Sequence, residues 1–155
     1  MDMKVNGGTH ERLVGVGETV SKTLRYSHED IAHFARLTHD ENPLHYEREA
    51  AQRAGFPDVI AAGQHTSATM TGLIATYFSR DDDGIAREML CLNLNFAYKH
   101  PVFADRDLEI MWRVASTQYN SKLGGVLAHL DGTATQEPGK PSVIARATVL
   151  VKLRG

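Results

Sequence analysis

An acidic and an imidazole side chain lie five residues apart around an Asn-Pro step in the stretch from Thr38 to His45. Asp40 accepts hydrogen bonds when ionised, and His45 can hold or release a proton near neutral pH. Such a pair can orient a water molecule, take one of its protons and return a proton elsewhere. Hydration of a double bond needs those steps.

The local sequence predicts that these two side chains meet through a bend. Pro43 pushes Asn42 out of the α region, so residues 40–45 are expected to form a turn rather than a continued helix. Spacing alone favours a structural explanation, in which Asp40 ends a helix and His45 is a hydrogen-bonded loop histidine. The chemical and structural interpretations both stay open at this point.

Several other polar residues allow both a functional and a structural interpretation. His65, one residue inside a predicted helix, is a possible substrate contact, although a lone histidine near a helix start is more often structural. Ser67 and Thr69 are possible pocket donors, but hydroxyl groups on a buried helix usually bond a nearby carbonyl. Lys99 and Arg113 could meet phosphates, whereas exposed cations are usually only solubilising.

No metal site is expected from the remaining candidates. The other histidines show no metal-ligand spacing, and the run from Asp81 to Gly84 is typical of a solvated loop. Cys91 is the only cysteine, so it forms no internal disulfide, and we expect it to be a small buried hydrophobe.

Length and composition predict one globular domain over residues 1–155, with a flexible N-terminus over residues 1–13. The formal charge of −2 and the lack of a dense basic run argue against a nucleic-acid partner. The sequence has neither the apolar core of a signal peptide nor an apolar run long enough to span a bilayer. We therefore expect no membrane partner and a cytoplasmic location.

The hydrophobic periodicity changes along the chain from helical to alternating. Residues 19–26 alternate as a short strand, residues 27–38 begin with a capping-box-like Ser27 and Asp30, and a second short helix is expected over 48–54. One long helix is predicted over residues 64–79, apolar or small on most sides. Four strands are then expected over 90–98, 108–115, 125–135 and 142–153. This order predicts an α+β fold with a curved antiparallel sheet wrapped around one long central helix.

The order of elements and three local blocks resemble the hotdog fold of the MaoC-like dehydratase and R-specific enoyl-CoA hydratase family, over roughly residues 16–153. The first and most specific block is the hydratase 2 signature, matched here by Phe34, Thr38, Asp40, Asn42, Pro43, Leu44, His45 and Ala51. The second is Ile60-Ala61-Ala62-Gly63, and the third is Pro101-Val102-Phe103. The chain departs from the signature at His39, where the family has a glycine that can serve a positive φ angle.

The resemblance implies a site and an activity. Asp40 and His45 become the catalytic pair, Asn42 supports their loop, and the backbone N–H of Gly63 binds the thioester oxygen. The implied reaction is R-specific hydration of trans-2-enoyl-CoA to R-3-hydroxyacyl-CoA, or the reverse dehydration, without a cofactor because coenzyme A is part of the substrate. A homodimer or higher homo-oligomer is also implied.

Two other functions remain open on this fold, because fold does not decide function. A hotdog acyl-CoA thioesterase is the rival enzyme, but many of these resemble one another in placing an Asp or Glu on the central helix, and residues 64–79 contain neither. A non-catalytic subunit that binds acyl thioesters would leave the Asp40 and His45 pair idle.

Overall fold

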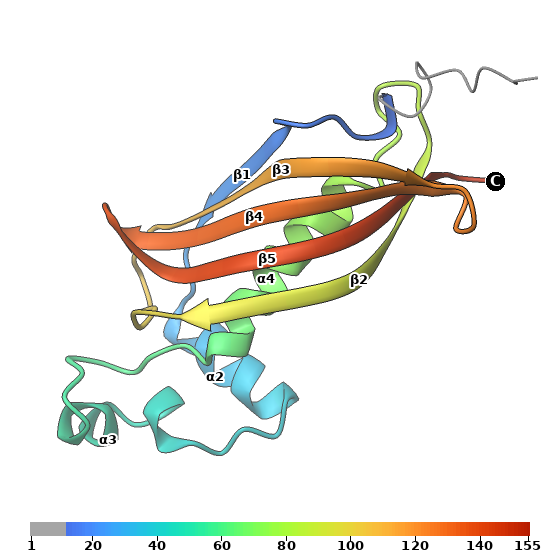
Figure 1. Ribbon diagram of the computed structural model, residues 1–155. Helices are drawn as coiled ribbons and strands as arrows, with labels where there is room; N and C mark the ends of the chain where they lie inside the picture. The colour runs from blue at the N-terminus through green and yellow to red at the C-terminus, as the bar shows by residue number, and fades with distance from the viewer. Residues whose placement is uncertain (1–11) are drawn as a thin grey trace, which may run out of the picture.

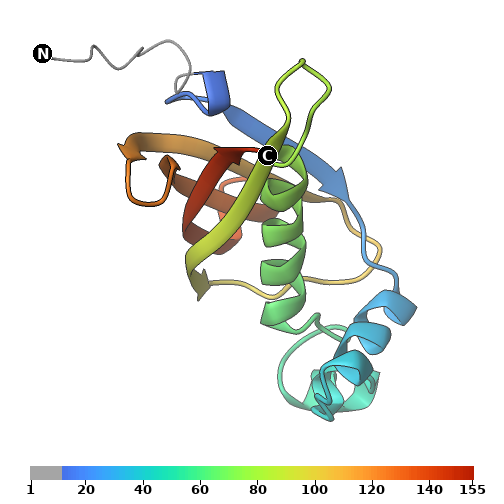
Figure 2. The same ribbon diagram turned by 90° about the vertical axis from the view of Figure 1, so that its right-hand side faces the viewer.

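The longest helix, α4 (Gly63–Tyr77), lies along one face of a curved antiparallel sheet in the computed structural model, which describes residues 12–155. Figure 1 shows the sheet in front of α4, and Figure 2 shows the smaller helices gathered at the N-terminal end of α4. The sheet has five strands in the order β1-β3-β4-β5-β2. This arrangement confirms the predicted α+β architecture.

The bounds of the elements follow the predicted periodicity closely. In chain order they are β1 (Thr19–Leu24), α2 (His28–Leu37), the 3₁₀ turn η1 (Pro43–His45), α3 (Arg48–Arg53), α4 (Gly63–Tyr77), β2 (Arg87–Tyr98), β3 (Leu108–Asn120), β4 (Gly125–Glu137) and β5 (Lys140–Leu153). Strands β2 to β5 extend beyond the predicted bounds, whereas β1 ends at Leu24, two residues before the predicted end at Tyr26.

The topology explains why a helix must cross the sheet. Within the described part of the chain, β1 and β2 lie at opposite edges, with β1 paired only with β3 and β2 only with β5. The chain between them therefore has to traverse one face, and α4 makes most of that crossing. Its side chains Met70 and Ile74 are fully buried against the sheet, so burial of apolar surface holds the helix in place.

Trp112 of β3 is the largest fully buried side chain. Its indole Nε1–H donates to the carbonyl oxygen of Met70 at 3.0 Å, which satisfies the polar atom of the ring within the core. A Cβ atom placed on Gly132 of β4 would lie 2.5 Å from Cε3 of this ring. The glycine is therefore required by the close approach of a buried indole.

Strand β2 differs from the sequence prediction in which side chains it buries. The expected half-buried row Leu90, Leu92 and Leu94 is exposed by 56%, 49% and 40%. A bulge between Cys91 and Asn93 breaks the alternation, and β2 is an edge strand with one neighbour only. For the same reason Cys91 is exposed, so the expectation that it is a buried hydrophobe was wrong.

The predicted flexible segment over residues 1–13 falls almost wholly outside the described residues. Of its last two residues, Leu13 is buried and its carbonyl accepts a hydrogen bond from Arg87 at 2.8 Å. Within residues 12–155, no helix combines the length and the apolar character that crossing a membrane would take.

Replacing Gly132 by alanine is expected to lower the free energy of unfolding by about 1–3 kcal/mol, because the new methyl group would press on a fully buried ring. Gly72 of α4 provides the matched control, since a Cβ there would meet no atom within 4 Å. Gly72→Ala should be neutral or stabilising. Urea unfolding of both variants measures the difference, and equal stabilities would show that Trp112 does not restrict position 132.

Candidate active site

Helix α2 is closed at both ends by side-chain and backbone hydrogen bonds. At its start, the Ser27 hydroxyl accepts from Asp30 N–H while the Asp30 carboxylate accepts from Ser27 N–H, so the predicted capping box is confirmed. At its end, Asp40 N–H donates to Ala35 O at 2.8 Å and His39 N–H donates to Arg36 O at 3.1 Å. These two bonds form a Schellman motif.

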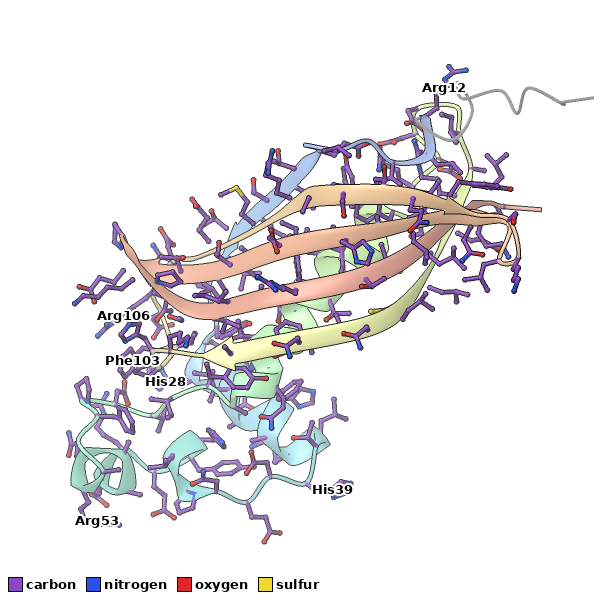
Figure 3. The ribbon with its side chains drawn as sticks, in the orientation of Figure 1. Arg12, His28, His39, Arg53, Phe103 and Arg106 are labelled. Atoms are coloured by element: carbon purple, nitrogen blue, oxygen red, sulfur yellow. The ribbon has the colours of Figure 1, made fainter. Side chains whose placement is uncertain are left out.

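His39 occupies the left-handed position of this motif, with φ of 59°. The family glycine therefore stands where the backbone has a positive φ, and here a histidine adopts the same conformation. Figure 3 shows His39 pointing away from the rest of the protein after α2. The backbone consequence is that Asp40, the next residue, leaves the helix in a fixed direction.

Asp40 and His45 are brought together, as the bend predicted. Nε2 of His45 lies 3.1 Å from Oδ2 of Asp40. His45 is buried, whereas the Asp40 side chain keeps about a third of its surface exposed. One partner is therefore held inside the protein, while the other still faces outward, where a ligand can reach it.

The backbone carbonyl of Ile60 fixes the state of the His45 ring. Nδ1 of His45 lies 2.7 Å from Ile60 O, and a carbonyl oxygen only accepts, so Nδ1 carries the hydrogen. The Nε2 contact with Asp40 then needs one further proton, held by Nε2 or by the carboxyl group. The pair thus shares a single proton, which is a suitable starting state for taking one proton and giving another.

The loop around the pair is stiffened by its own polar groups. Asn42 N–H donates to Oδ1 of Asp40 at 3.0 Å, and Oδ1 of Asn42 accepts from Leu44 N–H at 3.2 Å. The hydroxyl of Tyr46 donates to the carbonyl oxygen of Asp40 at 2.7 Å. The sequence reading singled out Asn42 but missed Tyr46, since nothing in the spacing links a tyrosine hydroxyl to a backbone oxygen six residues earlier.

The second and third sequence blocks are neighbours in space. Ile60 pairs with Phe103 as an isolated antiparallel bridge, and Ala61 N–H donates to Val102 O at 2.9 Å. Ile60 N–H also donates to Leu44 O at 3.0 Å. The short segment before α4 is thus held from two sides, which fixes the Ile60 carbonyl that accepts a hydrogen bond from His45.

Gly63 begins α4, and its flat surface is covered by an aromatic ring. A Cβ on Gly63 would lie 2.8 Å from Cε1 of Tyr98, and the Tyr98 hydroxyl lies 2.6 Å from Oγ of Ser67. Ser67 also donates to Gly63 O at 3.3 Å. N–H groups in the first helical turn have no intrahelical acceptor, so the amide of Gly63 is a donor at the positive end of a helix dipole.

The other candidates are distributed differently. The ring of His65 is stacked between Tyr26 and Phe34, and its Nδ1 is buried without a partner among the described residues. Thr69 donates to His65 O at 2.9 Å, the local carbonyl bond expected of a hydroxyl on a helix. Arg113 lies between the inward-facing Trp112 and Val114 on β3, so it points to the opposite face of the sheet from α4.

A cavity of about 460 Å³ lies beside the N-terminus of α4. Its lining comprises Phe56, Ile60, Ala61, Ala62, Gly63, Gln64, Thr66, Tyr98, Lys99, His100, Pro101, Val102 and Val143. Lys99 and Gly63 both line this cavity. Asp40 and His45 do not line it, but His45 is hydrogen-bonded to Ile60, which does. Among residues 12–155 no three His, Cys, Asp or Glu side chains cluster as metal ligands would.

Comparison with known proteins identifies the fold and the relatives. The family model described as MaoC-like domain matches residues 14–136. Two mitochondrial 3-hydroxyacyl-acyl-carrier-protein dehydratases, from Solanum lycopersicum and Arabidopsis thaliana, are 32% and 36% identical over 66 residues. That segment covers 43% of this chain and 40% of each plant protein, so the match spans well under half of their length.

An (R)-hydratase from A. caviae is structurally similar, with a TM-score of 0.76 and 23% sequence identity. The likeness covers 91% of this chain and 98% of that one. At this level of identity the comparison establishes the fold, which is the hotdog fold that the three sequence blocks implied.

Replacing His39 by glycine is expected to raise the free energy of unfolding by up to about 1 kcal/mol, because glycine adopts the left-handed conformation without the steric cost of a Cβ atom. His39→Val should lower it by about 1–2 kcal/mol, since β-branched residues are disfavoured there. Urea unfolding ranks the three proteins. The order Val above His above Gly would contradict the assigned role of position 39.

Proposed function

This chain belongs to the MaoC-like domain family, and from that premise we propose that it hydrates trans-2-enoyl thioesters to R-3-hydroxyacyl thioesters, or catalyses the reverse dehydration. The observation that carries the proposal is the 3.1 Å contact between Oδ2 of Asp40 and Nε2 of His45, whose Nδ1 is hydrogen-bonded to Ile60 O. The names of the plant dehydratases and of the A. caviae hydratase support the same class of hydro-lyase.

The proposed mechanism uses the single proton shared by the pair. A water molecule in contact with both groups gives a proton to the unprotonated partner as its oxygen bonds to C3 of the substrate. The protonated partner gives its proton to C2 as the double bond is lost. The pair ends with the same number of protons, and both additions come from one side because the two groups lie on one side of the substrate.

Negative charge develops on the thioester oxygen as C3 is attacked. The amide N–H of Gly63 at the start of α4 is proposed to donate to this oxygen, with the helix dipole adding to the stabilisation. The missing Cβ of Gly63 makes room for the Tyr98 ring, so the substrate is proposed to reach the amide from the cavity that Gly63 lines. Ser67 is hydrogen-bonded to Tyr98 and lies one turn further along α4. It is proposed as a second polar contact for the substrate.

Coenzyme A is the proposed carrier, with Lys99 at the cavity as a candidate partner for its phosphates. The two plant relatives are named for acyl carrier protein, so both carriers belong in the assay. Those relatives are also named as mitochondrial, whereas a cytoplasmic location stays our prediction for this chain.

A homodimer is proposed to form through the free edge of β2. Leu92 and Leu94 are exposed on this strand, and an edge strand has unpaired backbone groups that can extend the sheet into a second copy. Burial of these leucines in an interface would remove an apolar surface that is costly to expose to water.

Asp40→Asn and His45→Gln are each expected to lower kcat by about 100- to 1000-fold, because each removes one partner of the proton exchange. Hydration of crotonyl-CoA, followed by the loss of enoyl-thioester absorbance, measures the effect. Glu41→Gln is the matched control for Asp40, since Glu41 is an exposed carboxylate in the same loop. His33→Gln, on the exposed side of α2, is the control for His45.

The assay also separates the competing functions. Release of free thiol would identify a thioesterase, although α4 carries no Asp or Glu. Binding of crotonyl-CoA without conversion would identify a non-catalytic subunit. Full hydratase activity in either Asp40→Asn or His45→Gln would remove the proposed mechanism.

Paired substitution of Leu92 and Leu94 by aspartate is expected to convert the dimer to a monomer, because charges at a sheet edge oppose pairing. Light scattering after size-exclusion chromatography should give about twice the 17.1 kDa chain mass for the unaltered protein and the chain mass for the variant. Leu37→Asp, at a leucine 67% exposed on α2, is the control. An unaltered mass in the β2 variant would reject this edge as the interface.

A further inference from the structure

Three aromatic rings are stacked between the helices that carry the two halves of the site. The centroid of the His65 ring lies 4.0 Å from that of Tyr26 and 4.5 Å from that of Phe34, with interplanar angles of 16° and 3°. His65 is therefore the middle ring of a nearly parallel stack. Stacked aromatic pairs at this separation add stabilisation beyond the area they bury.

The outer rings attach this stack to the segment that leads to Asp40. Phe34 belongs to α2, and Tyr26 precedes the N-cap of the same helix. Tyr26 is itself tied to α4, because its hydroxyl donates to Oγ1 of Thr69 at 2.9 Å. The stack and this hydrogen bond together fix α2 against the first turns of α4.

The two halves of the site depend on that contact. Asp40 follows α2 through the Schellman turn, so its position follows the position of α2. His45 is held by Ile60 O, and Gly63 begins α4 only three residues later. A shift of α2 relative to α4 would therefore change the distance between the Asp40 carboxylate and both other groups.

The middle ring is held in a form without charge. Nδ1 of His65 is buried and has no hydrogen-bond partner among the described residues, so a hydrogen there would find no acceptor. Burial lowers the pKa of His65, the nearby Asp30 carboxylate opposes this, and a charged His45 lowers the pKa further. Asp30 from α2, His45 from η1 and the phenol of Tyr26 are the titratable groups that face the ring.

We propose, on the basis of the function proposed above, that His65 is a positioning residue whose neutral ring clamps α2 to α4 and so sets the geometry between Asp40 and His45. It acts through its ring faces and not by contact with the substrate. A flat aromatic ring without nitrogen, such as the somewhat larger phenyl ring, should therefore serve in its place, which a substrate contact through Nε2 would not allow.

Substitution at position 65 separates the two roles. His65→Ala is expected to lower kcat about 10- to 100-fold with little change in KM, since small displacements of catalytic groups have effects of this size. His65→Phe should keep kcat within about threefold, because the stack is preserved. His33→Ala, at an exposed histidine on α2, is the control and should change nothing. Equal losses in the Ala and Phe variants, with a raised KM, would overturn the proposal.

The pH profile provides a second readout that packing alone would not change. The lowered pKa of His65 means that the stack is fully formed above the ordinary histidine range and is lost as acid protonates the ring. Below the ordinary histidine pKa of about 6.5, kcat/KM should therefore fall more steeply with added acid in the unaltered protein than in His65→Phe. Parallel profiles would contradict the clamp by a neutral ring.

Two further measurements keep the test independent of folding and of the proposed reaction. Phe34→Leu removes an outer ring that does not line the cavity and should reproduce the His65→Ala effect, with circular dichroism confirming that each variant is folded. The ¹⁵N resonances of the His45 ring report its contact with Asp40 without any substrate. They should shift in His65→Ala and stay in place in His65→Phe. If the unaltered protein shows no hydratase activity, the proposed function fails, while these resonances still decide the role of His65.

Discussion

The hydrogen bond between Nδ1 of His45 and the carbonyl oxygen of Ile60 is the contact on which the proposed chemistry depends. It selects which ring nitrogen carries a hydrogen, and so leaves Nε2 to share a proton with Asp40. The carbonyl can act in this way only because Ile60 is itself held by Leu44 and Phe103. The first and third sequence blocks lie far apart along the chain, yet their residues Leu44 and Phe103 both hold Ile60 in place.

The turn at His39 shows how a departure from a family signature can leave the site intact. A positive φ is required there because the Schellman motif directs Asp40 away from the helix. Glycine meets this requirement without steric cost, and histidine meets it with some. The side chain points to solvent (Figure 3), so the substitution changes the backbone energy without filling the site.

Sequence periodicity was sufficient to predict the elements, and the signature was sufficient to bring Asp40 and His45 together, because both are local properties of the chain. The features that the sequence did not predict depend on contacts between residues far apart along the chain. The exposure of Leu90, Leu92 and Cys91 comes from a bulge on an edge strand, which no alternation of residue types reveals. The cover that Tyr98 gives Gly63 joins β2 to α4 across 35 positions of the chain, and the stacking of His65 likewise needs the tertiary fold.

A neutral His65 also matters for the charge of the proposed catalytic pair. The exchange proposed for Asp40 and His45 requires one proton on the pair before and after each turnover. A positive charge on the neighbouring His65 ring would stabilise the carboxylate and oppose protonation of His45, which would disturb that balance. His65 is packed between two rings, and its Nδ1 is buried without a hydrogen-bond partner among residues 12–155, which keeps such a charge out of the region. The stack of Tyr26, His65 and Phe34 is thereby proposed both to fix the geometry of Asp40 and His45 and to keep one proton on that pair.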